Sequence, residues 1–186
     1  DLKNFLATNA SSTTAVAMPA VPIVVTGLTL NKSTLSLGLG SSEKLLAAIV
    51  PANATNASVT WESSNTGVAT VDGEGNVTAK SGGTANIKAV SVGNPNISAT
   101  CVVTIIVPVT GITLDNGSIT MDDGTTATLK ATIQPDTASN KNVNWFTSDA
   151  SFATVAGGVV TALKPGTVLI TASTAENPAI GATCTV

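Results

Sequence analysis

Short stretches in which apolar and polar residues alternate recur along most of the chain. In 128–134 the apolar residues Leu129, Ala131 and Ile133 alternate with Thr, Lys, Thr and Gln. Side chains of a β-strand point alternately to its two faces, so this pattern predicts a strand with one buried face. Because no stretch combines a long helical period with capping residues, we predict an all-β protein with little helix.

The same succession of residues occurs twice. The hexapeptide Val-Thr-Gly-Leu-Thr-Leu at 25–30 returns as Val-Thr-Gly-Ile-Thr-Leu at 109–114, a shift of 84 positions. Trp61 and Trp145 keep this shift, and one gap of a single residue brings the later motifs into line. A match over the whole unit indicates a duplicated domain.

We therefore predict two domains, 22–106 and 107–186, preceded by an N-terminal arm or linker at 1–21. The short Val107-Pro108 connection predicts a stiff, end-to-end pair. Turn-forming pairs such as Asn116-Gly117 and Pro165-Gly166 divide each domain into about seven short strands. This spacing predicts two tandem immunoglobulin-like antiparallel β-sandwiches.

Composition narrows the chemistry further. The chain has no His and no Arg, which removes the usual neutral-pH base and the bidentate phosphate clamp. A net charge of −3 without a basic cluster argues against binding nucleic acid or docking on an anionic membrane. No apolar run is long enough for a membrane helix, and a signal peptide is expected to be either removed or never present.

The order of short motifs resembles one known family. The first copy carries Trp61-Glu62-Ser63-Ser64, Val68-Ala69-Thr70-Val71, Gly75-Asn76-Val77-Thr78-Ala79 and Gly83-Thr84-Ala85. The second carries Trp145-Phe146-Thr147-Ser148, Ala153-Thr154-Val155, Val160-Thr161-Ala162 and Gly166-Thr167. Over residues 22–186 this set is similar to the bacterial immunoglobulin-like group 2 (BIG2) domain. The resemblance implies a non-catalytic module of bacterial surface proteins, adhesins and phage virion proteins.

Cysteine and tryptophan occupy matching positions in the two copies. Cys101 and Cys184 fall on the inward face of the last strand of each domain, and in an end-to-end pair they lie too far apart for a disulfide. We expect both to be small buried side chains rather than reactive thiols. Trp61 and Trp145 also point inward, which favours core anchors over a sugar-stacking pair.

Several apolar residues point outward in the predicted register. In the first domain these are Leu46, Ala48 and Val50, where the second domain has Lys, Thr and Gln. Two further residues, Val102 and Ile106, point outward on the last strand. In the second domain Phe146 is outward where the first has Glu62. Exposed apolar clusters mark contact surfaces, although scattered surface hydrophobes are also tolerated, so these six residues form a candidate contact surface.

Other features favour no particular site. Asp122-Asp123-Gly124 could contribute carboxylates to a calcium site, but the first copy has Gly38-Leu39-Gly40 there, and a polar turn explains the sequence. We predict no catalytic residue, no metal and no cofactor. The arm at 1–21 is either a linker to an upstream domain or an extended segment that adds a strand to a neighbouring subunit.

The predicted function is that of a structural or interaction protein with protein partners, through self-assembly or a larger assembly. Its location would be extracellular: a bacterial surface, a filament or a phage particle. Two alternatives remain open. One is an adhesin that binds a host glycan or protein, although the end loops are Ala-, Asn-, Thr- and Ser-rich and give a glycan no specific support. The other is an accessory region of a larger secreted enzyme.

Overall fold

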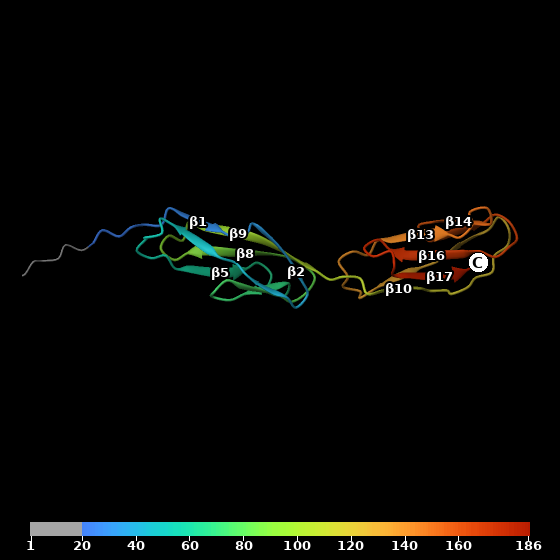
Figure 1. Ribbon diagram of the computed structural model, residues 1–186, viewed down its shortest axis with the longest axis horizontal. Coiled ribbons are helices and arrows are strands. Elements are labelled where there is room, and N and C mark those ends of the chain that lie inside the picture. Colours follow the sequence, from blue (N-terminus) through green and yellow to red (C-terminus); the bar gives the residue numbers. More distant parts are fainter. Residues whose placement is uncertain (1–19) are drawn as a thin grey trace, which may run out of the picture.

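The computed structural model describes residues 20–186, which form two β-sandwiches placed end to end (Figure 1). Here they are called unit 1 (22–106) and unit 2 (107–186), after the predicted domain limits. Residues 1–19 of the predicted arm lie outside the described residues. The all-β, tandem immunoglobulin-like fold is confirmed, and no helix within 20–186 is long and apolar enough to cross a membrane.

Unit 1 contains nine strands: β1 (Gly27–Leu30), β2 (Thr34–Gly38), β3 (Ser42–Lys44), β4 (Ala47–Val50), β5 (Val59–Ser63), β6 (Ala69–Val71), β7 (Asn76–Ala79), β8 (Gly83–Ser91) and β9 (Ser98–Ile106). One layer is the sheet β2-β9-β8-β5, and the other is β3-β7-β6, with the ribbon β1-β4 beside them.

Unit 2 contains eight strands: β10 (Gly111–Leu114), β11 (Thr126–Thr128), β12 (Ala131–Gln134), β13 (Val143–Thr147), β14 (Ala153–Ala156), β15 (Val159–Ala162), β16 (Leu169–Thr174) and β17 (Gly181–Thr185). Its sheets are β13-β16-β17, β11-β15-β14 and the ribbon β10-β12.

The strand detail differs from the sequence prediction of about seven antiparallel strands in each unit. In unit 1 the stretch 27–38 is divided into β1 and β2, and β2 runs parallel to β9 while β1 pairs with β4. The strand predicted at 128–134 is likewise divided, between β11 and β12, which lie in different sheets. In both cases one continuous stretch of chain passes from one sheet to the other, which apolar–polar alternation does not reveal.

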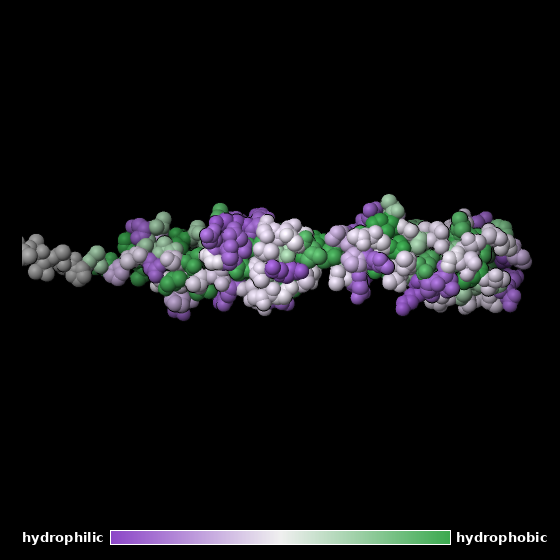
Figure 2. Space-filling view, turned by 90° about the horizontal axis from the view of Figure 1, so that it is seen from below, coloured by the Kyte–Doolittle hydropathy of each residue, from purple (hydrophilic) through white to green (hydrophobic). Residues whose placement is uncertain are grey.

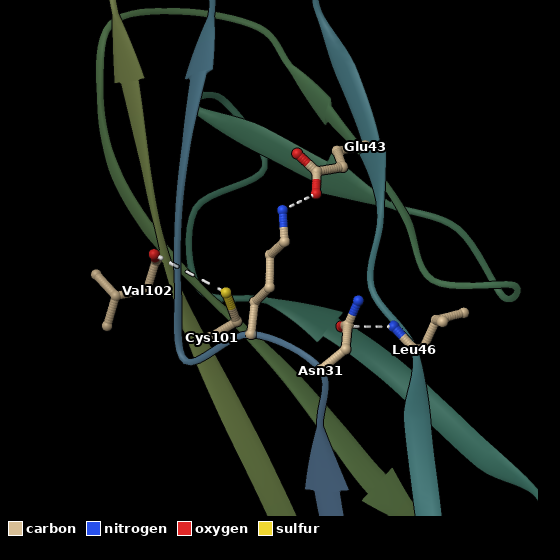
Figure 3. Close-up of polar contacts among 6 residues, drawn as sticks. Asn31, Glu43, Leu46, Cys101 and Val102 are labelled. Carbon is tan, nitrogen blue, oxygen red and sulfur yellow. Dashed lines mark hydrogen bonds and ion pairs between the residues drawn. The ribbon is translucent and has the colours of Figure 1, made fainter.

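An asparagine fixes the point at which β3 gives way to β4. The N–H of Leu45 donates to the carbonyl of Gly75 on the β7 side, at 2.9 Å. One residue later the N–H of Leu46 donates to Oδ1 of Asn31, at 2.9 Å (Figure 3). The Asn31 N–H donates back to the Leu46 carbonyl, at 3.0 Å. Asn31 thus satisfies the backbone groups that the change of sheet would leave unpaired. Lys32, next in the chain, forms an ion pair with Glu43 on β3 (Figure 3).

Unit 2 repeats this arrangement with an aspartate. Leu129 donates to the carbonyl of Gly158 at 2.9 Å, and Lys130 donates its N–H to Oδ1 of Asp115 at 2.9 Å. The Asp115 N–H returns a bond to the Lys130 carbonyl at 3.0 Å. A short polar side chain with an oxygen acceptor is therefore the requirement at this position in both units.

The core of each unit lies between its layers and is made mostly of small aliphatic side chains. Ile87 and Ile170 occupy the same place in β8 and β16, and both are fully buried. The tryptophan of each unit packs against this core at one side. Because aromatic residues are few, aliphatic contacts of this kind supply most of the stabilisation from burial.

Candidate functional site

The predicted contact surface of unit 1 begins just before β4 and continues along it. Leu46 precedes this strand and is 56% exposed, and Val50 at its end is 49% exposed, with Ala48 exposed between them. The alternate residues of β4 turn toward the interior. Asn31 holds the backbone of Leu46, and the pairing of β4 with β1 holds the rest, so the three side chains lie in a row on a fixed backbone.

The other predicted residues lie on different sheets. Val102 and Ile106 are exposed on β9, in the four-stranded layer of unit 1. Phe146 is 55% exposed on β13 of unit 2. The structure therefore does not gather the six residues into one patch. In one view, hydrophobic residues form separate patches along both units, with polar residues between them (Figure 2).

Sequence reasoning missed a partner for Phe146. Leu169 on β16 is 45% exposed, and the pairing of Phe146 with Thr171 places Leu169 diagonally across from it on the same face. Unit 1 has an ion pair on the corresponding face, between Glu62 and Lys88 at 3.1 Å. The sequence could have indicated this residue, because Val168 and Ile170 on either side of it point inward and alternation then places Leu169 outward. The predicted contact residues of unit 1 thus lie at β4 and β9, whereas Phe146 and Leu169 of unit 2 lie on β13 and β16.

Each tryptophan packs against the hydrophobic core of its unit. Trp61 is half-buried against the core of unit 1, and Trp145 against that of unit 2. Each indole lies over a glycine. A Cβ added to Gly75 would come within 2.8 Å of Trp61 Cζ2, and one added to Gly158 within 3.1 Å of Trp145 Cζ2.

Cys101 and Cys184 are free and fully buried in the two cores. Burial raises the pKa of both thiols above the ordinary value, because a charged thiolate is disfavoured away from water. A reactive cysteine requires the opposite shift together with exposure.

Two aspartates, Asp72 and Asp149, accept hydrogen bonds from residues that follow them in turns. Hydrogen bonds from the side chain and N–H of Asn76 hold the pKa of Asp72 below its ordinary value, and those from Ser151 do the same for Asp149. A general acid at neutral pH needs a carboxyl pKa shifted upward. In residues 20–186 no three or more His, Cys, Asp or Glu side chains come together as metal ligands.

The joint between the units is compact. The Val107 N–H donates to Ser139 Oγ and the Ser139 N–H donates to the Val107 carbonyl, both at 2.9 Å. Unit 1 touches this joint through Gly82, where a Cβ would lie 3.0 Å from Val107 and 3.4 Å from the Thr137 carbonyl. Ile23 and Thr55 form the same reciprocal pair at the start of unit 1, with both bonds at 2.8 Å.

Comparison with known proteins identifies the domains. The family model of the bacterial Ig-like domain (group 2) matches residues 24–103 and again residues 108–186. The chain belongs to this bacterial Ig-like family. The resemblance seen in the sequence motifs is confirmed, and the two matched ranges contain the strands of the two sandwiches except for the last three residues of β9.

Two relatives match most of the chain. An uncharacterized protein of Clostridium acetobutylicum is 34% identical over 165 residues, covering 88% of this chain and 17% of that protein. An Ig-like virion protein of Serratia phage KSP90 is 34% identical over 162 residues, covering 84% of this chain and 62% of that protein. The chain thus spans less than two thirds of the length of either.

A shorter stretch of the chain is similar to part of an enzyme. An α-L-arabinofuranosidase of Bifidobacterium longum is 44% identical over 69 residues, which is 37% of this chain and 6% of that protein. The similar stretch is shorter than one unit of the present chain. It therefore relates an Ig-like domain of this chain to a small part of a much longer protein.

Proposed function

We propose that this chain is a non-catalytic structural protein whose two Ig-like domains act as a stiff module on a bacterial surface, in an extracellular filament or on a phage particle. The observation that carries the proposal is the compact joint between the units. Reciprocal hydrogen bonds with Ser139 fix the start of unit 2 at Val107, directly after β9 of unit 1, and Gly82 of unit 1 lies against Val107 and the Thr137 carbonyl. Such a joint supports a role in spacing and presenting other parts of an assembly.

The virion relative supports the choice of a particle or surface setting. It matches across both units and is itself described as an Ig-like virion protein. The pKa values of Asp72 and Asp149 are lowered, both thiols are buried and the chain has no His, so these groups give no support to acid–base or thiol catalysis.

We further propose that the row Leu46, Ala48 and Val50 packs on a neighbouring copy of the chain. The residues at the same places in unit 2 are Lys130, Thr132 and Gln134, so the fold itself does not require apolar side chains there. Water exposure of this row costs free energy that burial against a partner recovers. The supporting observation is that the row is exposed and held on a fixed backbone.

The test transplants the unit 2 residues into unit 1. The triple variant L46K, A48T and V50Q is expected to weaken self-association by about tenfold or more, because about 2 kcal/mol of apolar burial is removed. Sedimentation velocity and light scattering over a concentration series measure the association. Thermal unfolding checks that the fold is unchanged.

The matched control is Leu163→Lys, which changes an exposed leucine of unit 2 outside this row. It is expected to associate like the original chain. Self-association that is equally strong in the triple variant and the control would place the contact elsewhere. A chain that stays monomeric throughout would remove self-assembly and leave the module as a spacer.

A second candidate is an accessory region of a larger secreted enzyme. The match to a short part of an arabinofuranosidase supports it. In that setting the same stiff joint would hold a catalytic domain at a distance from its support. Recognition of a host glycan or protein, as in an adhesin, has weaker support, because the end loops 53–57 and 138–142 lack aromatic residues and carry little charge.

A further inference from the structure

The strand β4 of unit 1 pairs along one of its two edges. Its neighbour there is β1, with which it forms a ribbon of two antiparallel strands. The Asn31 N–H donates to the Leu46 carbonyl at 3.0 Å, so Leu46 and every second residue after it turn their backbone groups toward β1. The N–H and carbonyl groups of the residues between them, Ala47 and Ile49, therefore point to the opposite edge.

This opposite edge is open within residues 20–186. No backbone hydrogen bond in this part of the chain involves the N–H or carbonyl of Ala47 or Ile49. On this side the last partner is Gly75, whose carbonyl accepts from the Leu45 N–H at 2.9 Å. Unpaired backbone groups along a strand edge are a template for pairing with another strand.

The side chains of the open edge are apolar on both faces. The run 45–50 reads Leu-Leu-Ala-Ala-Ile-Val and contains neither a charge nor a proline. Leu46, Ala48 and Val50 are exposed on the outer face, and Ala47 and Ile49 are partly buried on the inner face. Charge and proline are the usual means by which proteins prevent pairing at an edge, so this run favours pairing.

Unit 2 has the same open edge but protects it. There β12 pairs with β10, and in the described part of the chain Ala131 and Ile133 likewise form no backbone hydrogen bond on the other side. The outer residues of this strand are Lys130, Thr132 and Gln134. A lysine on an edge strand opposes the approach of a second strand, because pairing would remove water from its charge. Only unit 1 thus combines the open edge with apolar side chains.

The sequence of β4 is complementary to itself. When two copies of the strand run antiparallel with Ala48 at the centre, Ala47 of each copy lies opposite Ile49 of the other. These are the residues whose backbone groups are free, and each such pair exchanges two hydrogen bonds. Leu46 then lies opposite Val50 of the other copy on the outer face. The two small Ala48 side chains meet at the non-hydrogen-bonded position, where the strands are closest.

We propose that β4 is the site at which two copies of this chain pair edge to edge, antiparallel and centred on Ala48. The ribbons β1-β4 of the two copies then form one continuous sheet of four strands. This inference rests on the self-association proposed above for the row Leu46, Ala48 and Val50, and it adds the backbone of Ala47 and Ile49 as the binding groups. The contact uses the same surface on both copies, so it closes at a dimer.

Proline at position 47 tests the backbone contact. Proline has no N–H, and an edge strand accepts it where the N–H has no partner, so A47P removes one intermolecular donor from each copy and leaves the bonds to β1 in place. Self-association of the full chain is expected to weaken about tenfold or more in sedimentation velocity. The matched control A131P makes the same change on β12 and is expected to associate like the original chain. Thermal unfolding of both variants measures what the proline costs the fold.

Cross-linking through A48C tests the register and does not depend on the proline variant. Two cysteines at the facing central position lie within reach of a disulfide. Mild oxidation is expected to cross-link most of the associated A48C chains, whereas the control T132C, at the same place on β12, stays at background. Cys101 and Cys184 are buried and are expected to stay reduced.

Three results would overturn the edge pairing. If the variant L46K, A48T and V50Q weakened association but A47P did not, and A48C cross-linked no more than T132C, the row would pack face-on and the proposed self-association would stand. A chain that is monomeric at every concentration would remove self-association and this inference together. Protection of the Ala47 and Ile49 N–H groups from hydrogen exchange that does not depend on concentration would give the edge to a segment of the same chain.

Discussion

Replacing Gly75 with alanine is expected to destabilise unit 1 by about 3 kcal/mol or more, the sum of a left-handed backbone penalty and overpacking. Gly75 has φ +87°, and a Cβ at this place would lie 2.5 Å from the Leu45 carbonyl and 2.8 Å from the Trp61 ring. Neither neighbour can move freely. The Leu45 carbonyl is held in place by the hydrogen bonds of the strand that changes sheet, and the Trp61 indole packs against the core.

Replacing Gly158 with alanine is expected to destabilise unit 2 in the same way. Its φ is +89°, and a Cβ would lie 2.6 Å from the Leu129 carbonyl. Both glycines therefore carry a structural requirement of the fold: the backbone must pass closely over the tryptophan at the point where the neighbouring strand changes sheet. Chemical denaturation followed by tryptophan fluorescence measures each loss of stability.

The matched control is Gly40→Ala. Gly40 also has a positive φ, +77°, but a Cβ there would meet no atom within 4 Å. It is expected to cost only about 1–2 kcal/mol, from the backbone conformation alone. If the Gly75 and Gly40 variants lost equal stability, the close approach to Leu45 and Trp61 would not be a constraint.

The second large effect is expected from Ile170→Ala. This side chain is fully buried in the core of unit 2, and its truncation is expected to cost about 2–5 kcal/mol through lost burial and a residual cavity. A domain of this size has only about 5–15 kcal/mol of stability in total. Differential scanning calorimetry is expected to show a lower transition for unit 2 and an unchanged transition for unit 1.

Ile87→Ala is the reciprocal variant and is expected to lower the transition of unit 1 alone. Leu169→Ala, at the exposed neighbour of Ile170, is the control and is expected to change stability by about 0.5 kcal/mol or less. These variants also test the predicted domain limits at 106 and 107. A single transition that shifts as a whole with either isoleucine would mean that the two units unfold as one.

Much of the fold could be predicted because the chain contains two versions of it. The stretch 44–50 alone is ambiguous, since Leu45 and Leu46 are adjacent apolar residues, but alignment with 128–134 selects the inward set. The change of sheet at Leu46 could not be read in this way, because alternation describes faces and not hydrogen-bond partners. A polar residue at the same place in both copies, Asn31 and Asp115, was the available signal.

The candidate surface was predictable in part for the same reason. Register placed Leu46 and Phe146 outward, and both are more than half exposed. It could not say which outward residues meet, since that depends on how the sheets are joined, and the six residues lie at three strands, β4, β9 and β13, in two units.

The stiffness of the joint tests the central claim most directly. Spin labels attached through K88C in unit 1 and K164C in unit 2 allow the distance between the units to be measured by pulsed electron paramagnetic resonance. Cys101 and Cys184 are buried and are not expected to take up label in the folded chain. A single narrow distance distribution, broadened when Ser139 is replaced by alanine, is the result that a stiff structural module predicts. A broad distribution in the original chain would mean that the units move independently, and would contradict the proposed function.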